Sequence, residues 1–91
     1  DRIKIDLSAK ELRVDNIPVP LTKSEYLICE YLASNKGQVF SKEQIYEATF
    51  SLYGESDSST ISTHIKNIRS KFEKTGVQPI VTVWGIGYRW E

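Results

Sequence analysis

The chain has 91 residues, 40% of them hydrophobic, and its 12 Lys/Arg and 12 Asp/Glu cancel to a formal net charge of zero. This composition predicts one folded domain over residues 1–91 with a modest core, and it excludes a disordered chain or an indiscriminate polyanion binder. No segment has the pattern of a membrane span or a signal peptide, and a single cysteine allows no internal disulfide, so we expect a cytoplasmic location. The sequence contains no Met, so we also expect it to be a fragment of a longer protein.

The first twenty residues have the pattern of a small antiparallel sheet. Residues 2–7 and 11–14 alternate polar and apolar side chains, as half-buried strands do. Residues 17–21 form a third β-rich run, but its two prolines cannot donate hydrogen bonds to a neighbouring strand, which favours an edge position. We predict an N-terminal meander of three strands.

A first helix is predicted over residues 22–34. Thr22 and Glu25 have the spacing of a capping box, in which each side chain accepts a hydrogen bond from the other residue's backbone N–H. The expected buried residues are Tyr26, Ile28, Cys29 and Leu32, and the apolar residues that leave the helix phase open are Leu27 and Tyr31. No positioned base accompanies Cys29, so we interpret it as a small buried hydrophobe.

A short second helix is predicted over residues 41–49, opened by a second capping box at Ser41 and Gln44. It is expected to bury Ile45 and Ala48. Residues 50–57 show no periodicity and are turn-prone and acidic, so we expect a loop there.

The most informative segment is the third predicted helix, residues 58–74. Its apolar side chains, Ile61, Ile65, Ile68 and Phe72, fall within a sector of about 60° at 100° per residue. The opposite side is polar, and the helix has a net charge of +3. Such a face fits the DNA major groove, but it also fits a merely solvated helix. Ser58, Ser59 and Thr60 all remain candidates for its N-cap.

The two ends of the chain differ in charge. Residues 1–56 contain 7 Lys/Arg and 9 Asp/Glu, a net of −2, whereas residues 57–91 contain 5 Lys/Arg and 3 Asp/Glu, a net of +2. Any nucleic-acid surface should therefore lie in the C-terminal third.

The chain ends in two β-rich runs, residues 80–84 and 88–90. Gly85, Ile86 and Gly87 form a three-residue hairpin connection, with glycines available for positive φ. Strands, three helices and a hairpin in this order predict an α+β winged helix, a helix-turn-helix variant whose last helix enters the major groove.

Four motifs resemble the C-terminal effector domain of OmpR/PhoB-type response regulators. They are LT followed by EY at residues 21–26, GQVFSKE at 37–43, TI, HI, IR and KF within 60–72, and TVWGIGY at 82–88. The resemblance covers nearly the whole chain. It implies a four-stranded N-terminal sheet, three helices and a C-terminal wing.

The resemblance also implies a function in two-component signalling. It implies sequence-specific binding to promoter DNA, commonly as a head-to-tail pair on direct repeats. A missing N-terminal receiver domain would be phosphorylated on an aspartate by a sensor histidine kinase. The loop between the second and third helices would contact RNA polymerase, here through Phe50, Ser51, Leu52, Tyr53, Gly54 and Glu55.

Matched to the family's motifs, the third predicted helix is the recognition helix, and the resemblance implies that this helix and the wing contact DNA. The implied base-reading residues are Ser62, Thr63, Lys66 and Asn67, and the implied phosphate contacts are Ser59, His64, Arg69, Lys71 and Thr82. The amide of Asn67 has the donor and acceptor pattern that pairs with adenine.

The wing, residues 80–91, would lie on the adjacent backbone or minor groove, with Trp84 and Arg89 as its candidate residues. Some relatives have arginine at the position of Trp84, and a tryptophan cannot deliver that charge to a narrow minor groove. Trp84 either packs on sugars or braces the hairpin, and we favour the bracing role. Tyr88 and Trp90 are expected to form the hydrophobic body of the wing.

The sequence does not have the residues of an enzyme or a metal site. It contains no phosphate-binding glycine loop, no nucleophile paired with a base, and one histidine, His64, so we expect no catalysis, cofactor or metal. The alternative to DNA binding is a winged-helix module for protein–protein interaction, since fold alone does not fix function.

Overall fold

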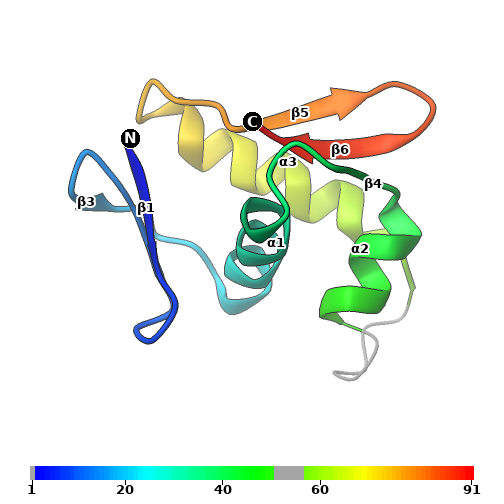
Figure 1. Ribbon diagram of the computed structural model, residues 1–91, viewed down its shortest axis with the longest axis horizontal. Helices are drawn as coiled ribbons and strands as arrows, with labels where there is room; N and C mark the ends of the chain where they lie inside the picture. The colour runs from blue at the N-terminus through cyan, green and yellow to red at the C-terminus, as the bar shows by residue number, and fades with distance from the viewer. Residues whose placement is uncertain (1, 51–56) are drawn as a thin grey trace.

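The computed structural model describes residues 2–50 and 57–91, and it arranges them as two small sheets flanking three helices (Figure 1). The first sheet has the order β1-β2-β3, built from β1 (Ile3–Asp6), β2 (Glu11–Val14) and β3 (Ile17–Pro18). Both pairings are antiparallel, so the predicted meander is confirmed. Within the described residues this sheet has three strands, so the fourth strand implied by the family resemblance is wrong here.

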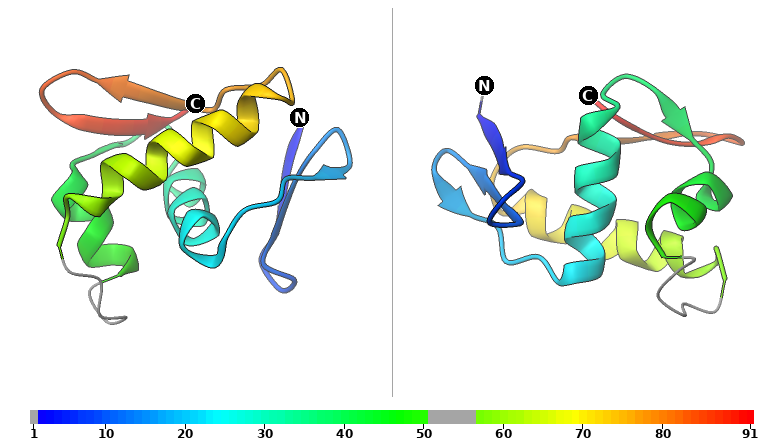
Figure 2. Two further views of the ribbon diagram at one scale, coloured as in Figure 1. Left: turned by 180° about the vertical axis from the view of Figure 1, so that it is seen from behind. Right: turned by 60° about the horizontal axis from the view of Figure 1, so that its bottom comes forward.

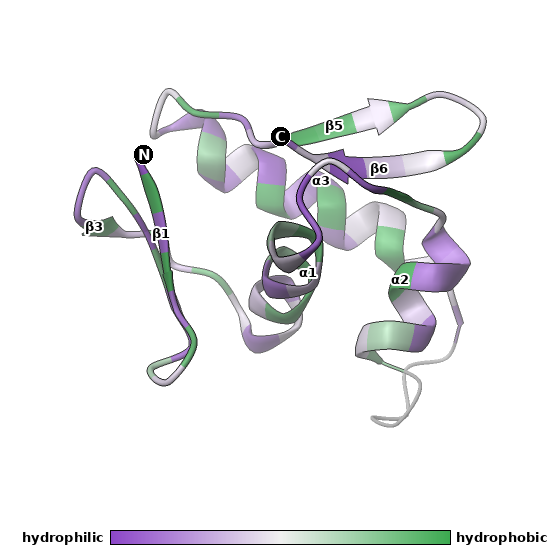
Figure 3. Cartoon of the chain, viewed as in Figure 1, coloured by the Kyte–Doolittle hydropathy of each residue, from purple (hydrophilic) through white to green (hydrophobic). Residues whose placement is uncertain are grey.

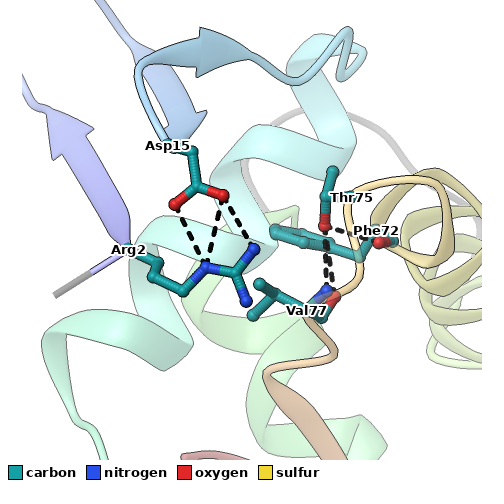
Figure 4. Close-up of polar contacts among 5 residues, drawn as sticks. All are labelled: Arg2, Asp15, Phe72, Thr75 and Val77. Carbon is teal, nitrogen blue, oxygen red and sulfur yellow. Dashed lines mark hydrogen bonds and ion pairs between the residues drawn. The ribbon is translucent and has the colours of Figure 1, made fainter.

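Polar contacts close the ends of this sheet and of the last helix (Figure 4). The Arg2 guanidinium donates to the Asp15 carboxylate at 2.7 Å, which joins the start of β1 to the β2–β3 turn. At the end of the last helix, the Thr75 hydroxyl donates to the Phe72 carbonyl at 2.6 Å and accepts from the Val77 amide at 3.1 Å. The second pair of contacts satisfies backbone groups where the helix stops.

The three helices are α1 (Lys23–Ser34), α2 (Lys42–Thr49) and α3 (Thr60–Glu73). The capping boxes predicted for the first two are both present, at Thr22 and at Ser41. Seen from behind, α3 lies in front of α1 and α2, on the outer side of the helical layer (Figure 2).

One hydrophobic core lies between the helices and the two sheets. The residues predicted for α1 are buried, and burial raises the pKa of the Cys29 thiol, so this cysteine is a packed, unreactive side chain. The prediction for α2 is half wrong, because Ile45 is buried but Ala48 is exposed. Thr49 is buried instead, one turn after Ile45, and its hydroxyl donates to the Ile45 carbonyl at 2.6 Å.

The second sheet contains the wing and a strand that the sequence did not predict. Its order is β4-β6-β5, from β4 (Val39–Phe40), β6 (Gly87–Trp90) and β5 (Ile80–Val83). The wing turn occupies residues 84–86, one residue earlier than predicted, because Val83 already pairs with Gly87. Only Gly85 of the two turn glycines has a positive φ.

Gly87 has a different role from the one predicted. It lies within β6, where a Cβ atom would stand 1.9 Å from the Phe40 carbonyl oxygen. Glycine therefore allows the backbones of β4 and β6 to approach each other. Among residues 2–50 and 57–91, no helix is both long and apolar enough to cross a membrane.

Candidate nucleic-acid interface

The outward face of α3 is polar along its length. The apolar stripe is completely buried, with Ile61, Ile65, Ile68 and Phe72 each at most 1% exposed. Figure 3 shows apolar and polar residues alternating along this helix, as an amphipathic helix requires. The four implied base-reading residues, Ser62, Thr63, Lys66 and Asn67, are all exposed. The helix is therefore held by its apolar side, with a cation, an amide and hydroxyl groups on the accessible side.

The first turn of α3 is organised by Asp57 rather than by a serine or threonine cap. Ser59 occupies the N-cap position, but its side chain makes no capping hydrogen bond. Instead, the Asp57 carboxylate accepts hydrogen bonds from the Ser59 amide, at 2.9 Å, and from the Ser59 hydroxyl. These hydrogen bonds lower the pKa of Asp57. The Ser59 hydroxyl, an implied phosphate contact, is thus already bonded within the chain.

Arg69 links α3 to the wing. Its guanidinium donates to the Ile80 carbonyl, at 3.1 Å, and to the Thr82 hydroxyl, at 2.6 Å. It also lies over the Tyr88 ring, 5.6 Å from the ring centroid. Two implied phosphate contacts, Arg69 and Thr82, are therefore bonded to each other and fix the wing relative to the helix.

Lys71 is directed away from the outward face of α3, towards α1. Its ammonium lies 2.5 Å from the Glu25 carboxylate, and the Glu25 side chain is 4% exposed. Burial alone raises the pKa of Glu25, but hydrogen bonds from Lys71 and the Thr22 amide outweigh it, so the pKa is lowered. A phosphate could reach Lys71 only by sharing or breaking this ion pair.

His64 packs towards the end of α2. Its ring centroid lies 5.3 Å from that of Phe50, and the His64 side chain is half-buried. Phe50, assigned above to a polymerase-contacting loop, is only 1% exposed and belongs to the core. The other residues of that assignment, Ser51, Leu52, Tyr53, Gly54 and Glu55, lie outside the described residues.

The wing carries exposed apolar side chains at its tip. Trp84 is 89% exposed and Ile86 is 62% exposed. The expectation that Trp84 braces the hairpin is therefore wrong, because its ring is almost fully in solvent. Tyr88 and Trp90 do form the body of the wing, with Trp90 4% exposed and edge-on to the Phe72 ring. Arg89 donates to the Glu91 carboxylate at 2.7 Å.

A groove of about 350 Å³ lies between the wing and the first turns of α2 and α3. Its lining includes Lys42, Ser62, Thr82, Trp84, Ile86 and Tyr88. Sequence reasoning missed Lys42 and Ile86 as members of this surface. The available signal for Ile86 was an apolar residue in a glycine-rich turn, whereas Lys42 joins the groove only through the tertiary fold.

Comparisons with known proteins agree with this geometry. A family described as "Transcriptional regulatory protein, C terminal" matches residues 16–90. The chain is 49% identical over 83 residues to the transcriptional regulatory protein SpaR of Bacillus subtilis, covering 91% of this chain and 38% of that relative. It is 39% identical over 85 residues to the response regulator SaeR of Staphylococcus epidermidis, covering 91% of this chain and 37% of SaeR. The chain thus spans less than two fifths of the length of these relatives.

Solved structures match over nearly the whole chain. The DNA-binding domain of the response regulator AdeR, solved in complex with an intercistronic region, has a TM-score of 0.87 and 25% identity, covering 100% of this chain and 94% of that one. DrrB, a Thermotoga maritima OmpR/PhoB homologue, has a TM-score of 0.83 and 28% identity, covering 99% of this chain and 42% of DrrB. This chain therefore belongs to the family of transcriptional regulatory protein C-terminal domains, a family of regulators rather than enzymes, and it has the winged-helix fold of the OmpR/PhoB type.

Proposed function

We propose that this chain binds double-stranded DNA at promoters, as the output domain of a phosphorylation-controlled transcriptional regulator. α3 enters the major groove, and the wing lies on the adjacent backbone or minor groove. The observation that carries the proposal is the exposure of Lys66 and Asn67 on the face opposite the buried stripe of α3. The solved complex of the AdeR domain with an intercistronic region supports it.

The residues of the interface divide into base readers on the outward face of α3 and residues that orient the wing. Asn67 can donate and accept on a base edge, and Thr63 can place its methyl group against a thymine methyl. Lys66 supplies charge to the same face, and Ser62 lies beside the groove that leads to the wing. Arg69 and Thr82 act mainly by orienting the wing, since each is bonded to the other.

The wider regulatory setting is also part of the proposal. The curated relatives are more than twice as long as this chain, which supports an additional N-terminal receiver domain, controlled by a sensor histidine kinase in the cytoplasm. RNA polymerase contact through the loop after α2 and head-to-tail pairing on direct repeats follow from the family resemblance.

The test is duplex binding measured by fluorescence anisotropy at several salt concentrations. Binding should weaken as salt rises, because each neutralised phosphate releases counterions. Lys66→Ala removes an exposed cation from the outward face of α3 and should reduce the slope of log affinity against log salt, because fewer counterions are released on binding. Lys4→Ala, which removes an exposed lysine from β1 in the first sheet, is the matched control and should leave the slope unchanged.

Specificity is tested with a duplex selected from a random pool. Asn67→Ala should weaken binding to that duplex by about 1–3 kcal/mol while changing binding to random DNA little. Absence of duplex binding by the wild type, or binding that does not depend on salt, would favour the protein–protein module instead.

A further inference from the structure

The wing turn exposes two large apolar side chains, Trp84 and Ile86, on either side of Gly85. Trp84 is 89% exposed and Ile86 is 62% exposed, while Gly85 between them has a φ of 79°. Tryptophan is usually largely buried, so an indole this exposed, two residues from a largely exposed isoleucine, points to a contact surface. In Figure 1 this turn forms the free end of the β5–β6 hairpin, beyond the end of the helical layer.

The position of this tip relative to α3 is fixed by contacts at the base of the wing. Arg69 bonds from α3 to Ile80 and Thr82, and β6 pairs with β4 along its other edge. The turn itself is closed by the Ile86 amide, which donates to the Val83 carbonyl at 3.0 Å. A turn whose backbone is already fixed loses little backbone entropy when its side chains bind.

The residues that line the groove between the wing and the first turns of α2 and α3 differ in chemistry. Lys42, Ser62 and Thr82 supply a cation and hydroxyl groups, with Glu43 beside Lys42, whereas Trp84 and Ile86 supply apolar surface. In a duplex, one sugar–phosphate strand separates the major groove from the neighbouring minor groove. When α3 occupies the major groove, the adjacent DNA strand can run along this groove of the protein. Its phosphates then lie near the polar lining residues and its sugars near the apolar ones.

We propose that Trp84 and Ile86 form an apolar wedge that packs against the sugars and base edges of the minor groove next to the site of α3. This inference rests on the proposed function and identifies the wing residues that contact DNA. Apolar wedges of this kind partly unstack a base step and favour DNA that bends readily there. The wing would thus add sequence preference through deformability, without a charged contact.

The first test is the affinity of Trp84→Ala for a duplex selected from a random pool, measured by anisotropy. We expect affinity to fall about tenfold, since Trp84→Ala removes the larger side chain of the apolar wedge, while the salt slope stays unchanged because no charge is removed. Trp84→Phe should retain affinity to within about threefold. Ile17→Ala removes another exposed apolar side chain, 68% exposed, from β3 and should have no effect. Thermal unfolding of each variant checks that the fold is intact.

The second test uses quenching of tryptophan fluorescence by acrylamide, a neutral quencher that the DNA charge does not repel. Of the chain's two tryptophans, Trp90 is 4% exposed, so quenching in the free protein reports mainly on Trp84. Adding the duplex should protect Trp84 from acrylamide. The wedge is overturned if Trp84 stays equally quenchable in the complex, or if Trp84→Ala binds within about twofold of wild type. Protection that depends on protein concentration without DNA would assign the tip to a contact between copies and also overturn it.

The two proposals can fail separately. DNA binding that depends on Lys66 but not on Trp84 removes the wedge alone. If the wild type binds no duplex at any salt concentration, the proposed function and the wedge both fall.

Discussion

The Lys71 ammonium lies 2.5 Å from the Glu25 carboxylate and joins the C-terminal half of α3 to the first turn of α1. The same Glu25 oxygen accepts the Thr22 amide at 2.9 Å, as part of the α1 capping box. A single buried carboxylate therefore both caps one helix and pairs with another, which fixes how the recognition helix sits on the core.

Removing the cation from this pair should destabilise the domain. Lys71→Met leaves the Glu25 carboxylate buried without its countercharge, so we expect the free energy of unfolding to fall by about 2–3 kcal/mol. Urea denaturation at neutral pH measures it. Lys74→Met, at an exposed position of the same helix end, should stay within about 0.5 kcal/mol of wild type. Equal effects of the two substitutions would contradict a structural role for Lys71.

The same ion pair predicts a pH dependence. The pKa of Glu25 is lowered in the folded state relative to its ordinary value of 4.5, so the folded protein binds its proton less readily than the unfolded chain does. The stabilisation is therefore complete above about pH 4.5 and is lost as the pH falls through the lower, folded-state pKa.

Glu25→Gln should accordingly flatten the acid side of the stability profile in urea unfolding measured from pH 7 downwards. Part of the slope should remain, because the pKa values of Asp15 and Asp57 are also lowered by hydrogen bonds. A variant stability profile that runs parallel to the wild-type profile at every pH would show that the pKa of Glu25 is not lowered in the folded state.

The Arg69–Thr82 hydrogen bond predicts energetic coupling between helix and wing. In a double-mutant cycle of Arg69→Met and Thr82→Val, the interaction energy should be about 1 kcal/mol, as for a partly exposed hydrogen bond to a charged group. Urea denaturation of the four proteins gives this value. The control cycle pairs Thr82→Val with Arg13→Met, on the other sheet, and should be additive within about 0.5 kcal/mol. Additivity in both cycles would contradict the link.

The two wing glycines should respond differently to alanine. Gly87→Ala places a Cβ against the Phe40 carbonyl oxygen, so it should separate β4 from β6 and cost about 3 kcal/mol. Gly85→Ala meets open space and only strains a backbone at φ 79°, at a cost of about 1 kcal/mol. Thermal unfolding of both variants measures the difference. A larger loss of stability for Gly85→Ala than for Gly87→Ala would contradict the close approach of the β4 backbone to Gly87.

The local elements of this fold are readable from the sequence because their signals are local. Capping boxes lie within four residues, and the stripe from Ile61 to Phe72 repeats at helical spacing. β4 has no such signal, since Val39 and Phe40 become a strand only by pairing with Arg89 and Tyr88, far along the chain.

The functional face was only partly predictable for the same reason. Helical spacing places Lys66, Arg69 and Lys71 all outside the apolar stripe, so the sequence cannot tell which cations stay available. The tertiary partners decide it: Arg69 meets the wing, Lys71 meets Glu25, and Lys66 remains exposed. The exposure of Trp84 likewise depends on the turn being one residue earlier than the glycines indicate.

The most direct test of the central claim is a nuclear magnetic resonance titration of the labelled chain with a duplex selected from a random pool. Our account predicts that the amide signals of Thr63, Lys66 and Asn67 shift most, together with those of the wing turn, while β1 and β2 are unaffected. Shifts confined to the N-terminal sheet, or none at low salt, would contradict it, because the duplex would then not be meeting the outward face of α3.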